Sequence, residues 1–269
     1  LMIDRGINTV ALQKDNVRPT RIVLVCRDID GERTFGGFEG DKGFGFADQA
    51  ISRDEIMKDW PLVADQAKWL IIGTIPLASQ TSSKAFSWCI EKALDEGIKI
   101  AIDLNWRPTF WRKEFSKEVA PSLEEINIIK PILNNASLIK LAKEEAQWFF
   151  NSSNPQEISL TLPQKPSIIV TDGANSIGWF LNKNIGNTNA ISPPKIVDTT
   201  GAGDAFTAGI IYKLLSVDLD HISYNMAEDI IRFAIGCGAY VCQSIGAIES
   251  QPYLEDVDEL LSSQNGGMS

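Results

Sequence analysis

Short apolar runs alternate with helical stretches along most of the chain after residue 66. Four of the runs have the length and composition of buried strands: 69–73, 99–103, 137–141 and 167–171. Helical patterns at 82–96 and 143–150 follow two of them, and Gly97 suits the position just after a helix. Short apolar strands that alternate with helices are typical of a mostly parallel sheet with helices on both faces. The sequence therefore predicts an α/β fold.

A β-hairpin is predicted ahead of this alternation, over residues 20–38. Its two arms, 21–26 and 32–38, flank the segment Asp28–Gly31, which has turn chemistry. The run from Phe35 to Phe46 is so rich in glycine that it cannot hold regular structure, and we expect it to form a loop.

The second half of the chain adds further elements to this pattern. Ser122 and Glu125 have the spacing of a capping box, which predicts the start of a helix. Two more strands are predicted at 177–181 and 190–197, joined by the turn-rich segment 182–189. The last predicted helices lie at 205–215, 223–242 and 255–262.

The composition excludes several classes of protein. The chain has 35 acidic and 25 basic residues, a formal net charge of −10, whereas binding along a nucleic-acid backbone needs an excess of Lys and Arg. No apolar stretch approaches the length of about 18 residues that a membrane span needs, and no signal peptide is visible. The 4 cysteines form no C-x-x-C pair, and the single histidine, His221, argues against a zinc site or a His-dependent triad. We expect a cytoplasmic protein with reduced thiols and no nucleic-acid or membrane partner.

Polar residues directly follow several predicted strands, at 103–107, 171–173 and 198–204. In open α/β sheets, ligands bind at the carboxyl ends of the strands. The strongest of these features is the segment 198–206, where two glycines flank an alanine as a loop becomes a helix. The first N–H groups of such a helix point at a ligand, and the helix dipole favours negative charge. We interpret residues 198–204 as an anion hole and call them the anion-hole loop.

The anion-hole loop differs from two common phosphate-binding motifs. A Walker A loop needs Lys-Ser/Thr after its glycines, and a dinucleotide fingerprint needs a third glycine where Phe206 stands. Asp204, beside the anion hole, allows two interpretations. It is either a helix N-terminal residue stabilised by the dipole, or the base that removes a hydroxyl proton as a phosphoryl group arrives.

Residues 198–206, Asp-Thr-Thr-Gly-Ala-Gly-Asp-Ala-Phe, resemble the C-terminal signature of the PfkB, or ribokinase-like, carbohydrate kinases. Four further segments resemble motifs of that family, in the family's order. They are the D-x-N-x-R strand end at 102–107, the N/S-x-x-E motif at 140–145, the T-x-G-x-x-G nucleotide turn at 170–178 and the loop closing the nucleotide site at 244–248. The resemblance runs from residue 1 to about residue 255. It is nearest to fructokinases of the cyanobacterial and plastid type, through Asp-Leu-Asn-Trp-Arg-Pro at 103–108 and Gly-Glu-Arg-Thr-Phe at 31–35.

The resemblance implies a ribokinase-like fold, a three-layer, mostly parallel sheet with helices on both faces and a small β lid. Residues 1–19 would be the opening segment of the core, 20–48 a partial lid and 49–269 the kinase core. The implied activity is ATP-dependent transfer of the γ-phosphoryl group to a primary sugar hydroxyl. Fructokinase is the expected enzyme, with 2-keto-3-deoxygluconate kinase or ribokinase as alternatives. A non-catalytic binding or scaffold protein of the same family is an alternative of another class.

The resemblance also implies roles for individual residues. Asp204 would be the catalytic base, and the developing charge would be held by the backbone N–H groups of Gly201, Ala202 and Gly203. The nucleotide would be bound by Thr171, Gly173, Gly178, Gly246 and Ala247. The sugar or the phosphates would face Asp103, Asn105 and Arg107. Mg²⁺ would be ordered through water by Glu145, and a monovalent cation, K⁺, would lie near Asp198 and Thr200.

Several of these side chains also have a purely structural interpretation. Glu145 belongs to an acidic pair at a helix start, where such pairs are usually solvated, and Arg107 could form a structural ion pair. Trp106 is more typical of a core than of a sugar platform. Gly236 and Gly238 favour close helix packing over contact with adenine.

Three departures from the family pattern bear on activity. Ala142 stands at the N/S position of N/S-x-x-E, and Ile235 stands where relatives often have Asn. The family's first strand with its sugar-binding Asp, and its Gly-Gly-x-x-x-Asn segment, are not found ahead of the hairpin. We therefore expect that the natural protein begins earlier and that this chain has an exposed sheet edge. The intact Gly-Ala-Gly-Asp favours an active kinase, whereas Ala142 favours the non-catalytic alternative.

The expected partner is a small sugar, and the charges of the lid bear on which one. Four lid cations could meet the carboxylate of an acid sugar: Arg21, Arg27, Arg33 and Lys42. Arg21 and Arg27 should share a face of their strand. Glu39 and Asp41 dilute the positive potential, which favours neutral fructose over 2-keto-3-deoxygluconate. We also expect a homodimer formed through the lid.

Overall fold

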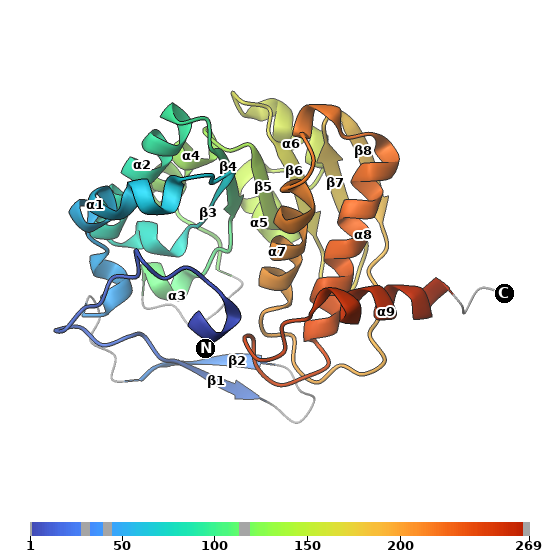
Figure 1. The fold of residues 1–269 in the computed structure, drawn as a ribbon, viewed down its shortest axis with the longest axis horizontal. Helices are drawn as coiled ribbons and strands as arrows, with labels where there is room; N and C mark the ends of the chain where they lie inside the picture. Colours follow the sequence, from blue (N-terminus) through green and yellow to red (C-terminus); the bar gives the residue numbers. More distant parts are fainter. Residues whose placement is uncertain (1, 28–32, 40–44, 113–118, 266–269) are drawn as a thin grey trace. The chain divides into compact units, whose positions relative to one another are not determined.

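The computed structural model describes residues 2–27, 33–39, 45–112 and 119–265 (Figure 1). The chain divides into two compact units, 1–137 and 138–269. Each unit is described separately below.

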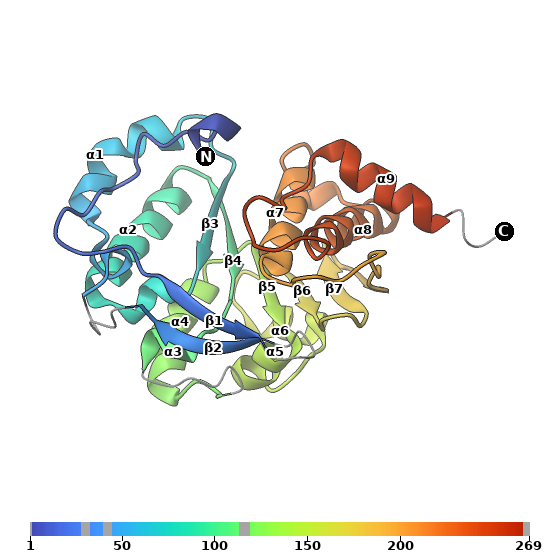
Figure 2. The ribbon, with the colours of Figure 1, turned by 90° about the horizontal axis from the view of Figure 1, so that it is seen from below.

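The lid hairpin of the first unit consists of β1 (Val23–Arg27) and β2 (Arg33–Phe38), which pair in antiparallel fashion. The register shifts between Leu24 and Val25, which marks a bulge in β1. Beside β2 lies the short helix α3 (Pro108–Trp111), and the Phe38 and Phe110 rings meet edge to face with centroids 5.1 Å apart (Figure 2). The predicted hairpin is confirmed.

The rest of the first unit is built around two parallel strands, β3 (Trp69–Gly73) and β4 (Lys99–Asp103). The helix between them, α2 (Gln80–Asp95), packs against α1 (Arg53–Ala64), and the Trp60 and Trp88 rings meet with centroids 5.4 Å apart. The predicted capping box opens α4 (Leu123–Leu133), because Ser122 accepts a hydrogen bond from Glu125 N–H and Glu125 accepts one from Ser122 N–H. The short 3-10 helices are η1 (Ile3–Arg5), η2 (Ala47–Ala50) and η3 (Ile75–Ala78).

The second unit contains four strands with helices on both faces. β5 (Leu138–Ala142) and β6 (Ser167–Thr171) pair in parallel, and β7 (Ile177–Leu181) and β8 (Asn184–Thr188) continue as antiparallel neighbours. Figure 2 shows α7 (Ala202–Leu214) and α8 (Tyr224–Val241) on one face of these strands, with α5 (Lys143–Phe150) and α6 (Pro155–Thr161) on the other. η4 (Leu219–His221) precedes α8, and α9 (Leu254–Asn265) packs across its end. The expected α/β class is thereby confirmed.

Glycines bring the helices of the second unit close together. A Cβ on Gly209 of α7 would lie 3.0 Å from Ala234 Cα of α8, and one on Gly238 would lie 3.0 Å from the carbonyl oxygen of Ala202. A Cβ on Gly236 would lie 2.9 Å from Val257 of α9. The packing interpretation is therefore confirmed for Gly236, whereas Gly238 both packs against α7 and lines a cavity at its start.

The strand predicted at 190–197 is wrong. The strand that pairs with β7 is 184–188, and residues 190–197 contain no strand. The turn is only two residues long, because Asn182 (φ 44°) and Lys183 (φ 65°) both adopt the left-handed conformation that a tight hairpin requires. The error arose because β8, Asn-Ile-Gly-Asn-Thr, is mostly polar and contains a glycine, so it lacks the composition typical of a strand. The glycine, Gly186, is needed because the Trp179 ring covers it and leaves no room for a Cβ.

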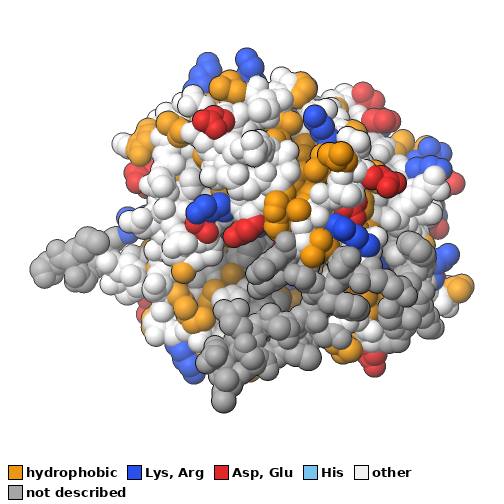
Figure 3. All heavy atoms as spheres, turned by 180° about the vertical axis from the view of Figure 1, so that it is seen from behind, with side chains coloured by type: hydrophobic (Ala, Val, Ile, Leu, Met, Phe, Trp, Pro, Cys, Tyr) orange, Lys and Arg blue, Asp and Glu red, His pale blue; other side chains and the backbone are white. Residues whose placement is uncertain are grey.

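Among the described residues, no helix is both long and apolar enough to cross a membrane. On the face shown in Figure 3, Lys and Arg side chains are interspersed with Asp and Glu.

Candidate active site

A cavity of about 350 Å³ lies in the second unit, against the start of α7. One side is formed by Thr171 and Gly173 at the end of β6, and another by Gly203 and Phe206 of α7. The segment 190–193 and residues of α8 complete its largely apolar wall. The cavity thus joins the predicted nucleotide turn to the anion-hole loop.

The anion-hole loop reaches α7 through a left-handed glycine. Gly201 has φ +81° and caps the helix, whose first three residues are Ala202, Gly203 and Asp204. A Cβ on Gly201 would lie 2.8 Å from Ala247 Cβ and 3.2 Å from the Ala247 carbonyl oxygen. Both the backbone conformation and the close approach of the 244–248 loop therefore require glycine at this position.

Asp198 ties the anion-hole loop together. One carboxylate oxygen accepts hydrogen bonds from Thr200 N–H (2.8 Å) and Thr200 Oγ1 (2.7 Å), and the other accepts one from Gly246 N–H (3.1 Å). The side chain is buried, and the N–H groups of Val197 and Asp198 both donate to the Cys242 carbonyl oxygen at the end of α8. Asp198 therefore sets the position of the loop against residues 244–248.

Asp204 occupies the third position of α7 and is exposed. The dipole of a helix stabilises negative charge on a side chain in the first turn. An exposed carboxylate at the start of a helix can accept a proton from an incoming hydroxyl group. The geometry thus agrees with both interpretations of Asp204, as a helix N-terminal residue and as a catalytic base.

Glu145 is buried rather than solvated, so the expectation of a solvated acidic pair is wrong for this residue. It is the third residue of α5, and its carboxylate accepts a hydrogen bond from Ala142 N–H at 2.7 Å. Ala142 occupies the N-cap position, and its side chain has no oxygen that could accept a hydrogen bond from Glu145 N–H. The departure from the N/S-x-x-E motif therefore leaves half of a capping box. Among the described residues, no group of three or more His, Cys, Asp or Glu side chains is placed to hold a metal ion.

The predicted residue Gly178 and the ion pair beyond β6 have distinct surroundings. Gly178 lies in β7, where a Cβ would meet Pro155 Cγ at 3.3 Å, so its small size serves packing against α6. Beyond β6, Lys143 and Asp172 form an ion pair with a distance of 2.8 Å. The hydrogen bond from Lys143 lowers the pKa of Asp172 and raises that of Lys143.

The D-x-N-x-R residues belong to the first unit. Asp103 is buried at the end of β4, and Asn105 has a left-handed backbone with φ 43°. Arg107 is exposed and donates to the carbonyl oxygen of Trp106 at 2.8 Å. Trp106 itself is buried and donates to the Val119 carbonyl oxygen, which confirms its core interpretation.

Arg21 is held inside the first unit. Its guanidinium donates two hydrogen bonds to Asp48, at 3.2 and 3.0 Å, and lies over the Phe38, Phe46 and Phe110 rings at 4.5, 4.4 and 4.8 Å from their centroids. Only 8% of its side chain is exposed. The idea that Arg21 could meet a substrate carboxylate is therefore wrong.

Several of the other charged residues of the lid belong to the part of the chain that the structure does not describe. The side chains of Arg27 and Arg33, and residues 41 and 42, lie outside the described residues.

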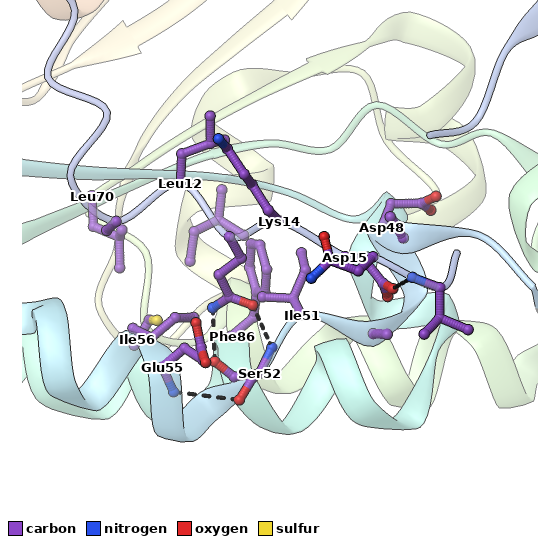
Figure 4. A pocket seen from close by; sticks show the side chains of 18 of the residues that line it. Leu12, Lys14, Asp15, Asp48, Ile51, Ser52, Glu55, Ile56, Leu70 and Phe86 are labelled. Carbon is purple, nitrogen blue, oxygen red and sulfur yellow. Dashed lines mark hydrogen bonds between the residues drawn. The ribbon is translucent and has the colours of Figure 1, made fainter. Parts of the chain in front are cut away.

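A larger cavity, about 710 Å³, lies in the first unit beneath the segment 11–17 (Figure 4). Its apolar floor includes Leu70 and Phe86, and Gln13 closes one side through hydrogen bonds of 2.9 and 2.8 Å with the backbone of Ser52. None of the predicted site residues lines it. Its walls come from segments without a recognisable motif, so sequence reasoning could not find it.

Residues 1–254 match the pfkB family carbohydrate kinases, and the chain belongs to this family. It is therefore a carbohydrate kinase, an enzyme that transfers a phosphoryl group to an alcohol. Among its relatives are the probable fructokinase-5 of Arabidopsis thaliana, 28% identical over 264 residues, and the fructokinase of Vibrio alginolyticus, 26% identical over 256 residues. The alignments cover 97% and 94% of this chain and 76% of each relative.

Solved structures confirm the ribokinase-like fold. The Vibrio cholerae O395 fructokinase bound to fructose, ADP and calcium matches with a TM-score of 0.75 and 24% identity, over 97% of this chain and 79% of that one. The Xylella fastidiosa fructokinase with bound ATP matches with a TM-score of 0.80 and 20% identity, over 98% and 80%. At these identities the likeness concerns the fold.

Sequence reasoning missed part of the cavity wall. Ile191, Ser192 and Pro193 follow β8 in an irregular segment, and the strand expected there would have hidden them. Ile235, singled out as a departure from the family pattern, lines the same cavity from α8. The signal that could have found the segment is its Ser-Pro-Pro run, which disfavours a strand.

Proposed function

We propose that this chain is a fructokinase, which transfers the γ-phosphoryl group of ATP to a primary hydroxyl group of fructose. The observation that carries the proposal is the anion-hole loop, held by Asp198 beside a cavity of about 350 Å³, with a carboxylate in the first turn of α7. The fructokinase names of the relatives support fructose as the acceptor.

In the proposed reaction the sugar hydroxyl oxygen attacks the γ-phosphorus. A new O–P bond forms, the bond to the bridging oxygen breaks, and ADP leaves with that electron pair. Asp204 takes the hydroxyl proton, which makes the oxygen a better nucleophile. The N–H groups of Gly201, Ala202 and Gly203 stabilise the charge on the transferred group, because they are already oriented by α7.

The cavity suits the nucleoside part of ATP. Its walls are largely apolar, and they include Ala202 and Gly203 at the start of α7, where phosphates would meet the helix dipole. Thr171 and Gly173 would line the nucleotide. Gly173 has φ +57°, so a larger residue there would strain the turn. Gly246 and Ala247 would close the phosphate end through their contact with the anion-hole loop.

The ions of the reaction are part of the proposal. Mg²⁺ binds oxygen ligands and keeps several waters, so one buried carboxylate, Glu145, fits an ion held mainly through water and ATP phosphates. Bound Mg²⁺ would neutralise charge on the phosphates. K⁺ would lie near Asp198 and Thr200.

The sugar would face Asp103, Asn105 and Arg107. We also propose a cytoplasmic location.

The test is a side-by-side turnover assay on fructose, ribose and 2-keto-3-deoxygluconate, with the wild type and Asp204→Asn. Fructose should be preferred, and loss of the base should lower kcat by about 10²- to 10⁴-fold while ATP binding persists. Omitting Mg²⁺ should abolish turnover, and replacing K⁺ by tetramethylammonium should reduce it. A preference for the acid sugar would refute the fructokinase assignment, and near-normal turnover by Asp204→Asn would remove Asp204 from the mechanism.

A further inference from the structure

One wall of the cavity of about 350 Å³ is an apolar face of α8. Ile235, Ala239 and Cys242 are spaced four and three residues apart, so they lie on the same side of the helix, and all three line the cavity. Ile235 is buried, and the Cys242 thiol donates to the carbonyl oxygen of Gly238 at 3.3 Å. This wall therefore offers a ligand packing surface but little hydrogen bonding.

The wall formed by residues 190–196 is also poor in groups that could recognise a base. Its apolar side chains are Ala190, Ile191, Pro193 and Ile196, and a proline has no N–H group to donate. Among the described residues that line the cavity, none has a carboxylate, amide or charged side chain. A purine bound there would be held mainly by apolar contact.

The polar side chains of the lining are hydroxyl groups, at Thr171, Ser192 and Thr199. Adenine carries a 6-amino group, which donates hydrogen bonds, where guanine and hypoxanthine carry an oxygen, which accepts them. A hydroxyl group both donates and accepts, so it can pair with either substituent, whereas an Asn or Gln amide pairs with the 6-amino group and N7 of adenine together. The lining thus contains no side chain that distinguishes the two kinds of purine.

Ile235 lies away from the end of the cavity assigned above to the phosphates. A Cβ on Gly238 would lie 3.0 Å from the carbonyl oxygen of Ala202 at the start of α7, whereas one on Gly209 would lie 3.0 Å from Ala234 Cα. Gly209 is seven residues after Ala202, which is about 10 Å along the helix. Ile235 directly follows Ala234, so its side chain lines the part of the cavity that suits the nucleoside.

We propose that the nucleotide site does not distinguish adenine from 6-oxo purines, and that Ile235 is the residue that sets this breadth. The inference rests on the proposed function and names the class of phosphoryl donor, which is purine nucleoside triphosphates with either an amino group or an oxygen at position 6. A site discriminates strongly only when its own polar groups lose their partners with the wrong ligand, and apolar side chains have no such groups to lose. The transfer step is unchanged, and each donor leaves as its diphosphate.

The first experiment compares ATP with ITP as donors for fructose in the wild type. ITP has the 6-oxygen but lacks the 2-amino group of guanine, so the comparison isolates position 6. The values of kcat/KM for the two donors, and the affinities for ADP and IDP measured by titration, should each agree within about tenfold. A larger preference for the adenine nucleotide in either measurement would overturn the proposal. This comparison needs no variant, so it does not depend on the folding of a mutant.

The second experiment places an amide or a hydroxyl group at position 235. Ile235→Asn should raise the ratio of ADP to IDP affinity by at least about tenfold, because one amide that pairs with adenine at two points discriminates by about 1–3 kcal/mol. Ile235→Thr is the matched control, since it is also polar and its hydroxyl group pairs with either purine, and it should keep the wild-type ratio. Equal ratios in Ile235→Asn and Ile235→Thr would overturn the role of Ile235.

Failure of this inference can be told apart from failure of the proposed function. A wild type that binds ADP and IDP alike but phosphorylates no sugar with either donor would refute the proposed function and leave the breadth of the site standing. A wild type that phosphorylates fructose with ATP but uses ITP more than about tenfold less efficiently would refute only the inference about the donor.

Discussion

At the scale of single residues, the anion-hole loop depends on side chains whose identity follows from their immediate contacts. Gly201 must be glycine because its φ is +81° and because Ala247 leaves no room for a Cβ. Asp198 must be a short carboxylate because its two oxygens accept three hydrogen bonds from Thr200 and Gly246. Ala142, by contrast, leaves a helix cap incomplete.

Ala142→Ser should stabilise the protein. Ala142 already has the extended backbone of an N-cap residue, with φ −75° and ψ 160°, so a serine hydroxyl could accept the N–H bond of Glu145 that alanine cannot. A completed cap is worth about 1 kcal/mol in the free energy of unfolding, measured by urea denaturation. Ala142→Val, which also lacks an acceptor, is the control and should bring no gain. An unchanged stability of Ala142→Ser would mean that the first turn of α5 is satisfied by other means.

At the scale of elements, the lid hairpin is joined to the rest of the first unit by Arg21. A two-stranded hairpin is marginally stable alone, so its position depends on such contacts. The planar guanidinium both binds Asp48 through two hydrogen bonds and stacks among three phenylalanine rings.

Arg21→Met should loosen the hairpin, because it removes the ion pair, the ring contacts of the guanidinium and the partner of Asp48. The free energy of unfolding should fall by about 2 kcal/mol, and amide hydrogen exchange over 23–27 and 33–38 should accelerate. Arg18→Met is the control, since Arg18 forms an exposed ion pair with Asp15 at 3.0 Å and such pairs contribute less than about 1 kcal/mol. If both variants lose the same stability, the ring cluster does not anchor the hairpin.

At the scale of the whole molecule, the lid offers a surface for self-association. Ile22, Val23 and Leu24 are 51%, 42% and 43% exposed, and within the described pairings β1 bonds to β2 alone. An apolar strand with an open edge tends to pair with another chain. We propose a homodimer formed through β1.

Leu24→Glu should convert this dimer to a monomer, because a charge on the exposed face of β1 opposes burial against a second copy. Sedimentation equilibrium of the wild type and the variant measures the change. Leu62→Glu, at a leucine of α1 that is 59% exposed, should leave the mass unchanged. A monomeric wild type, or a dimeric Leu24→Glu, would contradict the proposal.

The sequence by itself determined the class of fold and the anion-hole loop. Both are local: apolar runs of strand length, a capping box three residues wide at Ser122, and glycines where a loop meets a helix. It failed at 190–197, because strand propensity cannot distinguish an apolar coil from a strand when the true strand, β8, is mostly polar.

Only the tertiary structure decided which of the candidate side chains meet. Asp198 bonds to Gly246, 48 residues away along the chain, and Lys140 of β5 reaches Gly203 of α7. The sequence makes Arg21 a candidate for substrate binding, but the fold places its guanidinium over the rings of Phe38, Phe46 and Phe110. The reason is physical. A residue's type states what it can bind, whereas burial and the partners brought to it by the packing of distant segments decide what it does bind.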